Sequence, residues 1–183
     1  MIKIETLEVS GFGPALKALR LPHGLECRSE IYGNFSADSV ENIKRFSSSS
    51  FCIINDADIQ LMQRLIKGGD CEAKVLRGIL VYADITAPVY WWCENETYRH
   101  GHERLCSAST MHIDCKGLVG EELQKAKSEI PMGKELEKID FFSYQCLRNI
   151  YIWRKHHRLP EWRTFCEWIE SLPYAAELIT YGL

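Results

Sequence analysis

Apolar positions follow two different periods along this chain, and each period predicts a different kind of element. In residues 79–86 apolar side chains alternate from Ile79 to Ile85, which is the pattern of a strand with one buried face. Residues 2–9 partly alternate in the same way and predict a second strand. Elsewhere apolar residues recur every three or four positions, which predicts helices over residues 15–20, 55–67, 121–127 and 139–157, and helices that begin at Pro88 and Pro160.

Capping and helix-breaking residues support several of these boundaries. Asn55 or Asp56 suits the N-cap of a helix that Gly68 and Gly69 would end. Gly101 lowers the helix propensity of the segment after Pro88, so we expect a bend or break there. That helix is expected to carry Trp91, Trp92, Glu96, Arg99 and His100.

Composition is that of an ordinary globular protein. The chain has 183 residues, of which 46% are hydrophobic and 26% charged, enough to build one proper core. We find no internal repeat, and only the four serines at 47–50 read as a loop or mobile segment. Helices outnumber strands, so the pattern predicts a helix-rich α+β fold in a single domain over residues 1–183. The net charge of -3 brings no basic stripe, so we expect no duplex nucleic acid partner.

Two further features bear on the compartment. The N-terminal residues have no apolar signal core, and the longest uncharged apolar stretch, residues 85–93, is far too short to span a bilayer. We therefore expect a cytoplasmic protein with no membrane partner. The eight cysteines lie between Cys27 and Cys166 and are expected to be reduced thiols rather than a disulfide framework.

The first cluster that could carry chemistry is the charged segment 94–104. On a helix, Glu96, Arg99 and Glu103 would share one face, because residues three and four apart are neighbours. A solvated face of ion pairs explains this pattern without any function. However, the charges directly follow Trp91 and Trp92, and charges beside bulky aromatic residues often belong to a site or an interface.

Two other segments have both a structural and a functional interpretation. Residues 106–112 hold several hydroxyl side chains, which favour caps and turns, and such a turn can also bind a phosphate. In residues 148–158, Asn149 and Arg154 could project toward a ligand from one long helix, although cations also complement the C-terminal end of a helix dipole. Five positions place these two residues roughly 140° apart around an ideal helix, so one small pocket would not receive both.

Zinc is a third possibility, because five zinc-competent side chains follow one another in the middle of the chain. The spacing contains no Cys-x-x-Cys pair and matches no structural zinc module, so we expect no metal. The five residues are His100, His102, Cys106, His112 and Cys115.

In the order of its elements the chain resembles the flavin-dependent thymidylate synthases, the ThyX family. That family has a helix ending in Gly, a strand, Ala-Pro, and then the motif RHRxxSxNExSxRY, followed by a long helix with an Asn and, five residues later, an Arg. The corresponding segments here are Ala87-Pro88, Arg99-His100, Ser107-Ala-Ser109, and Asn149 with Arg154, with Trp162 on the helix that follows. The resemblance extends loosely over most of the chain and implies a small antiparallel sheet.

The sequence also departs from the family pattern. Gly101 replaces the second Arg of the triplet, Ser107 stands where the motif has Glu, and Met111 replaces the last Arg. Arg77 or Gly78 occupies the region in which the family places a His. These departures concern ligand contacts rather than the order of elements.

The resemblance implies a reaction and a site. FAD and methylenetetrahydrofolate would convert dUMP to dTMP, with the flavin supplying the hydride chemistry. Arg99, His100 and Asn149 would contact the flavin, and Ser107, Ser109 and Arg154 would face the nucleotide; no catalytic residue is assigned. The implied protein is a divergent, phage-type FAD-dependent methyltransferase that acts as a homotetramer, with Trp91, Trp92, Trp153 and Trp162 near its interfaces.

Three alternatives stay open. The first is a non-catalytic or repurposed ThyX-like protein that binds a nucleotide or a protein partner, and the missing motif letters are its main support. The second is an interaction domain whose order of elements matches the family by chance, and the third is a zinc protein. Fold resemblance alone does not decide among them.

Overall fold

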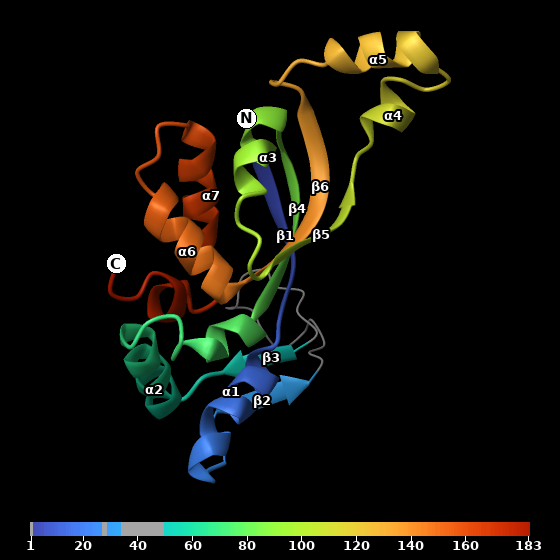
Figure 1. Ribbon diagram of the computed structural model, residues 1–183. Coiled ribbons are helices and arrows are strands. Elements are labelled where there is room, and N and C mark those ends of the chain that lie inside the picture. The colour runs from blue at the N-terminus through green and yellow to red at the C-terminus, as the bar shows by residue number, and fades with distance from the viewer. Residues whose placement is uncertain (1, 27–28, 34–49) are drawn as a thin grey trace, which may run out of the picture.

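The computed structural model describes residues 2–26, 29–33 and 50–183 (Figure 1). The loop or mobile segment expected at 47–50 lies almost wholly outside these residues, since only Ser50 is described. The strands are β1 Lys3–Ser10, β2 Glu30–Gly33, β3 Ser50–Ile53, β4 Leu80–Pro88, β5 His102–Ser107 and β6 Glu135–Ser143. The α-helices are α1 Phe12–Arg20, α2 Asp56–Lys67, α3 Val89–Asn95, α4 Thr110–Ile113, α5 Gly120–Ser128, α6 Tyr144–Arg154 and α7 Pro160–Glu170, with short helical segments at Leu21–His23, Lys74–Gly78 and Ala175–Ile179.

The main sheet has four antiparallel strands in the order β1-β4-β6-β5, and β2 pairs with β3 in a separate ribbon. On β4 the residues at alternate positions, Val81, Ala83, Ile85 and Ala87, have no exposed surface, as the two-residue period predicts. Helices α3, α6 and α7 cover this face of the sheet (Figure 1). The prediction of a helix-rich α+β fold with a small antiparallel sheet is confirmed.

A cluster of large aromatic side chains fills the space between this sheet face and the helices. Trp91 on α3 packs against its neighbour Trp92 and against Trp162 and Phe165 on α7, with the Trp91 and Trp162 rings 4.8 Å apart. The expectation that the tryptophans lie near subunit interfaces is therefore wrong for Trp91, Trp92 and Trp162, which are core residues. Trp153 differs from them, since 75% of its surface is exposed.

Two helices begin where their capping signals predict. The Asn55 side chain accepts a hydrogen bond from the Ala57 amide at 2.9 Å and caps α2, and α7 begins at Pro160. Helix α1 begins at Phe12, three residues before the predicted start at residue 15, and it follows Gly11 in a left-handed conformation (φ 88°). A Cβ atom at Gly11 would lie 1.9 Å from the Gly78 carbonyl oxygen, so this close approach requires glycine.

Two predicted helices are wrong in part. The helix that begins at Pro88 ends at Asn95, and the segment after it turns back and enters β5 at His102. Glu96, Arg99 and Glu103 therefore do not share a helical face. The helix expected over residues 139–157 begins only at Tyr144, because residues 135–143 form β6 between β4 and β5. The buried positions of β6 include Lys138 and Asp140, so charged side chains obscure the two-residue period of apolar residues that would predict a strand.

Beyond β5 the chain leaves the sheet. Residues 108–134, called the arm below, carry α4 and α5 and project past the end of the sheet before β6 returns (Figure 1). The arm exposes Met111, Ile113, Val119 and Met132. In the described part of the chain, no helix is long and apolar enough to cross a membrane.

Candidate functional site

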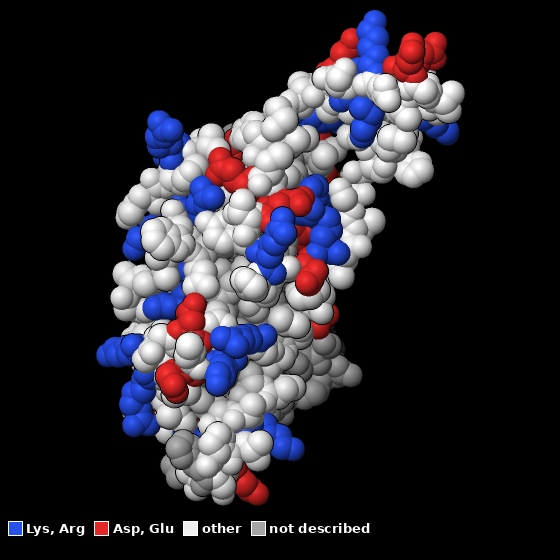
Figure 2. All heavy atoms as spheres, viewed as in Figure 1, with Lys and Arg blue, Asp and Glu red and all other residues white. Residues whose placement is uncertain are grey.

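An open cavity of about 290 Å³ lies where the turn after α3 meets β5. Its lining is polar and consists of Glu96, Arg99, His102, Glu103 and Arg104. Acidic and basic side chains are interspersed over the face of the molecule shown in Figure 2, so the electrostatics of this cavity depend on individual pairings rather than on a patch of one sign.

Gly101 fixes the turn that forms one wall of the cavity. Its φ is 77°, a conformation that favours glycine, and its carbonyl oxygen accepts a 2.6 Å hydrogen bond from the Ser143 amide. A Cβ atom at this position would lie 2.2 Å from the Ser143 Oγ. The Ser143 side chain in turn caps α6 by accepting from the Cys146 amide, so the turn is tied to the start of that helix.

A buried carboxylate holds two of the side chains that line the cavity. Asp140 on β6 has no exposed surface and accepts hydrogen bonds from His102 Nε2 at 2.7 Å and from Arg104 Nε at 2.9 Å. The other His102 nitrogen, Nδ1, lies 3.1 Å from the Tyr98 carbonyl oxygen, and the imidazole stacks on Phe142. Burial opposes ionisation of Asp140, but the hydrogen bonds from His102 and Arg104 outweigh it and lower its pKa.

A second carboxylate lies at the mouth. Glu96 Oε1 accepts from Arg104 Nη1 and lies 3.3 Å from Lys138 Nζ. Both cations also lie over the Trp92 ring, at 5.0 Å for Arg104 and 4.4 Å for Lys138. The hydrogen bond from Arg104 lowers the pKa of Glu96, while burial lowers the pKa of Lys138.

Of the six residues assigned from the family resemblance, Arg99 lines this cavity and the other five do not. Arg99 and His100 are exposed on the turn, and neither forms a hydrogen bond or ion pair with the residues that the structure describes. Asn149, on α6, points its Nδ2 toward Asp70 Oδ2 at 3.5 Å.

Arg154 is already engaged at the other end of α6. Its Nη1 donates to Glu94 Oε2 and its Nε to the Tyr98 hydroxyl, both at 2.8 Å, and its guanidinium lies 4.6 Å from the Trp162 ring centre. A nucleotide contact for Arg154 stays a prediction, and it would require these partners to be exchanged.

The two serines lie where the chain enters the arm. Ser107 is the last residue of β5 and its Oγ donates to the Ala108 carbonyl at 3.1 Å. Ser109 precedes α4 without a side-chain cap, and α4 has only four residues. Strand β5 continues to Ser107 and only residues 108 and 109 separate it from α4, and phosphate binding there stays a prediction.

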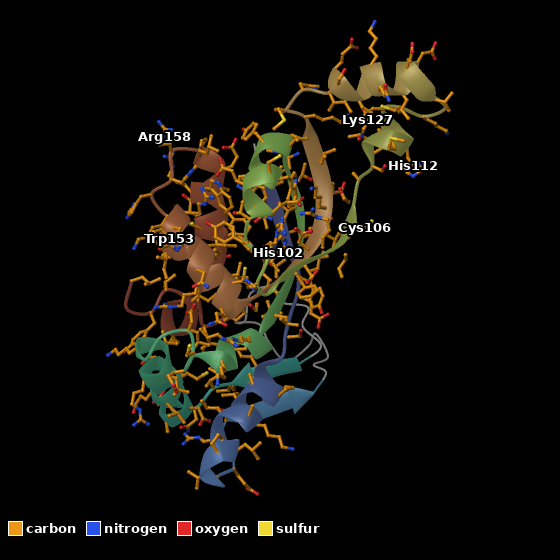
Figure 3. The ribbon with its side chains drawn as sticks, in the orientation of Figure 1. His102, Cys106, His112, Lys127, Trp153 and Arg158 are labelled. Atoms are coloured by element: carbon orange, nitrogen blue, oxygen red, sulfur yellow. The ribbon has the colours of Figure 1, made fainter. Side chains whose placement is uncertain are left out.

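Zinc-competent side chains do not come together in the described part of the chain, where no three His, Cys, Asp or Glu residues are grouped to hold a metal. Figure 3 shows why: His102, Cys106 and His112 are spaced out along β5 and the arm. The seven cysteines that the structure describes are free thiols.

Sequence reasoning missed Lys138 and Asp140, the two β6 residues that organise the charged cluster. A signal was present, because two charged residues alternate with apolar ones in 138–142. The helical interpretation of this segment concealed it.

Comparison with solved structures finds the same fold in enzymes of nucleotide metabolism. Thymidylate synthase X from Helicobacter pylori, solved with FAD and dUMP, is 12% identical, with coverage of 98% of this chain and 97% of that chain and a TM-score of 0.66. A second structure of the H. pylori enzyme with FAD and dUMP has 12% identity, coverage of 97% of each chain and a TM-score of 0.64. The UMP/dUMP methylase PolB from Streptomyces cacaoi, bound with 5-Br dUMP, is 11% identical, covers 98% and 95%, and has a TM-score of 0.62.

At this level of identity the similarity shows the fold alone. No family model matches the sequence. The search of curated proteins finds no match either.

Proposed function

We propose that this chain binds a pyrimidine mononucleotide of the dUMP class in the cavity beside β5. The observation that carries the proposal is the position of Arg99, an exposed guanidinium at that cavity with no partner among the described residues. Arginine recognises phosphate through paired N–H donors, so an unpaired guanidinium at a polar cavity suits a phosphate ester. The fold supports the choice of nucleotide, because neighbours with this architecture were solved with dUMP or 5-Br dUMP.

The volume of the cavity limits the ligand. At about 290 Å³ it lies just below the roughly 300–1,000 Å³ range of small-molecule sites, which suits a mononucleotide better than a dinucleotide. The charges that line it are nearly balanced, since Glu96 and Glu103 offset Arg99 and Arg104, and the neighbouring Asp140 offsets Lys138. A single phosphate paired with Arg99 is therefore the anionic group that the site supports best.

The residues of one chain do not fit a flavin held as the family motif implies. Gly101, in the place of the second arginine of the triplet, has no room for a side chain beside Ser143. The Asn149 amide is directed at the Asp70 carboxylate, an anion that would repel flavin phosphates. We therefore assign no flavin contact within one chain.

Flavin-dependent methylation of dUMP with methylenetetrahydrofolate is the second candidate function. It is favoured by the outward-facing, unpartnered Arg99-His100 pair, which would have to meet residues of a second copy to complete a flavin site. A homotetramer, as the family resemblance implies, would supply such a copy.

Calorimetric titration with dUMP tests the first proposal, and titration with FAD tests the second. We expect dUMP to bind, and Arg99→Ala to weaken it about tenfold, because one charge-assisted contact is lost. The matched control is Arg163→Ala on α7, an exposed arginine away from the cavity, which should leave binding unchanged. Absence of dUMP binding at high micromolar concentration would refute the nucleotide site.

The flavin proposal is tested by a separate measurement. Purified protein with bound flavin would show the flavin absorption bands, and light scattering would show whether the protein forms a tetramer. Binding of FAD to a stable monomer would contradict the intersubunit site. Binding of dUMP without FAD would leave the first proposal standing alone.

A further inference from the structure

Glu96 occupies a place that would suit an anionic group of a ligand. Its carboxylate lies between the Arg104 guanidinium and the Lys138 ammonium, at the mouth of the cavity. Both cations are held over the Trp92 ring, which fixes their positions independently of Glu96. The pair of cations is therefore a preformed anion site that the protein fills with its own carboxylate.

The three charged side chains differ in their access to water. The Glu96 side chain is 51% exposed, whereas that of Lys138 is 9% exposed and that of Arg104 is 25% exposed. Arg104 is also held from below by two hydrogen bonds to Asp140. Glu96 can turn into solvent and keep its charge hydrated, while the two cations stay in place.

The backbone permits this movement. Glu96 is the C-cap of α3, and its amide donates to the Trp92 carbonyl oxygen at 3.0 Å. This bond holds the main chain, so a change of the Glu96 side-chain rotamer toward solvent needs no movement of the backbone. When the Glu96 carboxylate turns into solvent, Asp140 is the one remaining carboxylate for Arg104 and Lys138 among the described residues, which leaves one positive charge without a partner.

We propose that Glu96 is an exchangeable internal anion, and that Arg104 and Lys138 receive the phosphate or carboxylate of a ligand in its place. The exchange itself follows from the geometry of the cluster. That the ligand is a nucleotide rests on the proposed function. Arg99, which lines the same cavity, would then be a further cation for the same anionic group.

The test is a titration of three proteins with three probes. Inorganic phosphate, dUMP and deoxyuridine are added to the wild type, to Glu96→Gln and to Glu103→Gln, and the indole signal of Trp92 is followed by NMR. Glu96→Gln should bind phosphate and dUMP about tenfold more tightly, because the competing carboxylate is gone. Deoxyuridine, which lacks a phosphate, should show no such gain. Glu103→Gln is the matched control, since Glu103 lines the same cavity without an ion pair among the described residues, and it should change affinity by less than about twofold.

Equal or weaker phosphate binding by Glu96→Gln would overturn the exchange. Adding Lys138→Met to Glu96→Gln should abolish the gain, and a gain that survives would overturn the role of Lys138. If Glu96→Gln is poorly folded, Glu96→Asp replaces it, because the shorter side chain withdraws the carboxylate from the cations and should also tighten phosphate binding. The two proposals fail separately. Tighter phosphate binding without dUMP binding leaves the anion site and removes the nucleotide, and dUMP binding without the gain does the reverse.

Discussion

Two arginine–glutamate pairs in this protein are built from the same parts, each with a tryptophan beneath the guanidinium. In one pair, Arg154 contacts Glu94 and lies over Trp162, and the Trp162 indole also donates to Glu94 at 2.8 Å. In the other, Arg104 contacts Glu96 and lies over Trp92. The first pair joins α3, α6 and α7, and the second faces an open cavity.

The difference lies in what remains unsatisfied. In the Arg154 pair, the guanidinium donates to the Tyr98 hydroxyl as well, and only 16% of its side chain is exposed. In the Arg104 pair, Lys138 adds a second cation, and the carboxylate is half exposed. The same chemistry therefore makes a closed tie between helices in one place and an exchangeable site in the other.

The largest effect should come from removing the buried carboxylate that supports the open pair. Asp140→Asn removes the buried charge that pairs with both Arg104 and His102, and we expect a loss of about 3–5 kcal/mol in the free energy of unfolding. Urea denaturation measures it. The control is Asp84→Asn on β4, a partly exposed carboxylate, which should stay within about 0.5 kcal/mol of the wild type. A similar small loss for Asp140→Asn would contradict the central role of this residue.

The same carboxylate predicts a pH dependence. The pKa of Asp140 is lowered in the folded protein, so its contribution is present above the unfolded pKa of about 3.9 and is lost as pH falls through the lower folded pKa. Denaturation curves between neutral and acid pH should therefore show a falling stability. In Asp140→Asn this part of the slope should be absent.

The next largest loss of stability is expected at the Arg154–Glu94 pair. Arg154→Met keeps the apolar stem but removes the hydrogen bonds to Glu94 and Tyr98, and should cost about 2 kcal/mol in the free energy of unfolding. Titration of this variant with dUMP sharpens the comparison. An unchanged affinity would mark the Arg154 pair as structural, and a weakened one would show that Arg154 also reaches the nucleotide.

An effect of similar size is expected at the turn. Gly101→Ala places a Cβ atom against Ser143 in a left-handed conformation, and should cost about 1–3 kcal/mol in thermal or urea unfolding. Because much of the clash is with the Ser143 side chain, the double variant with Ser143→Gly should lose less than the sum of the two single variants. Strict additivity would argue against this contact.

The smallest effect should be at the exposed thiols. Cys106→Ser on β5 should change stability by less than about 0.5 kcal/mol, since its side chain is exposed. Thiol titration of denatured, unreduced protein should find all eight cysteines. Stoichiometric zinc by elemental analysis, or a clear deficit of thiols, would contradict the reduced, metal-free state.

Local sequence signals were enough to predict an element where one short segment contains its capping residues and its apolar period. The helix over 56–67 has an N-cap residue, an apolar face and a terminating glycine within a few positions. The helix from Pro160 has a fixed start and a stripe that includes Trp162, Phe165 and Ile169, all of which are buried. Strand β4 shows a plain two-residue period because its buried positions are all apolar. In each case, neighbouring residues alone select the element.

Tertiary structure decided the elements that depend on hydrogen-bond partners and ion pairs from distant segments of the chain. Residues 139–150 satisfy a helical stripe, yet 135–143 form a strand because β4 and β5 supply hydrogen-bond partners on both sides. The buried Lys138 and Asp140 become favourable only when Arg104, His102 and Glu96 arrive from other segments to pair with them. Burying a charge costs much less free energy with a partner than without one. The sequence of a single segment does not show which distant residue will be that partner.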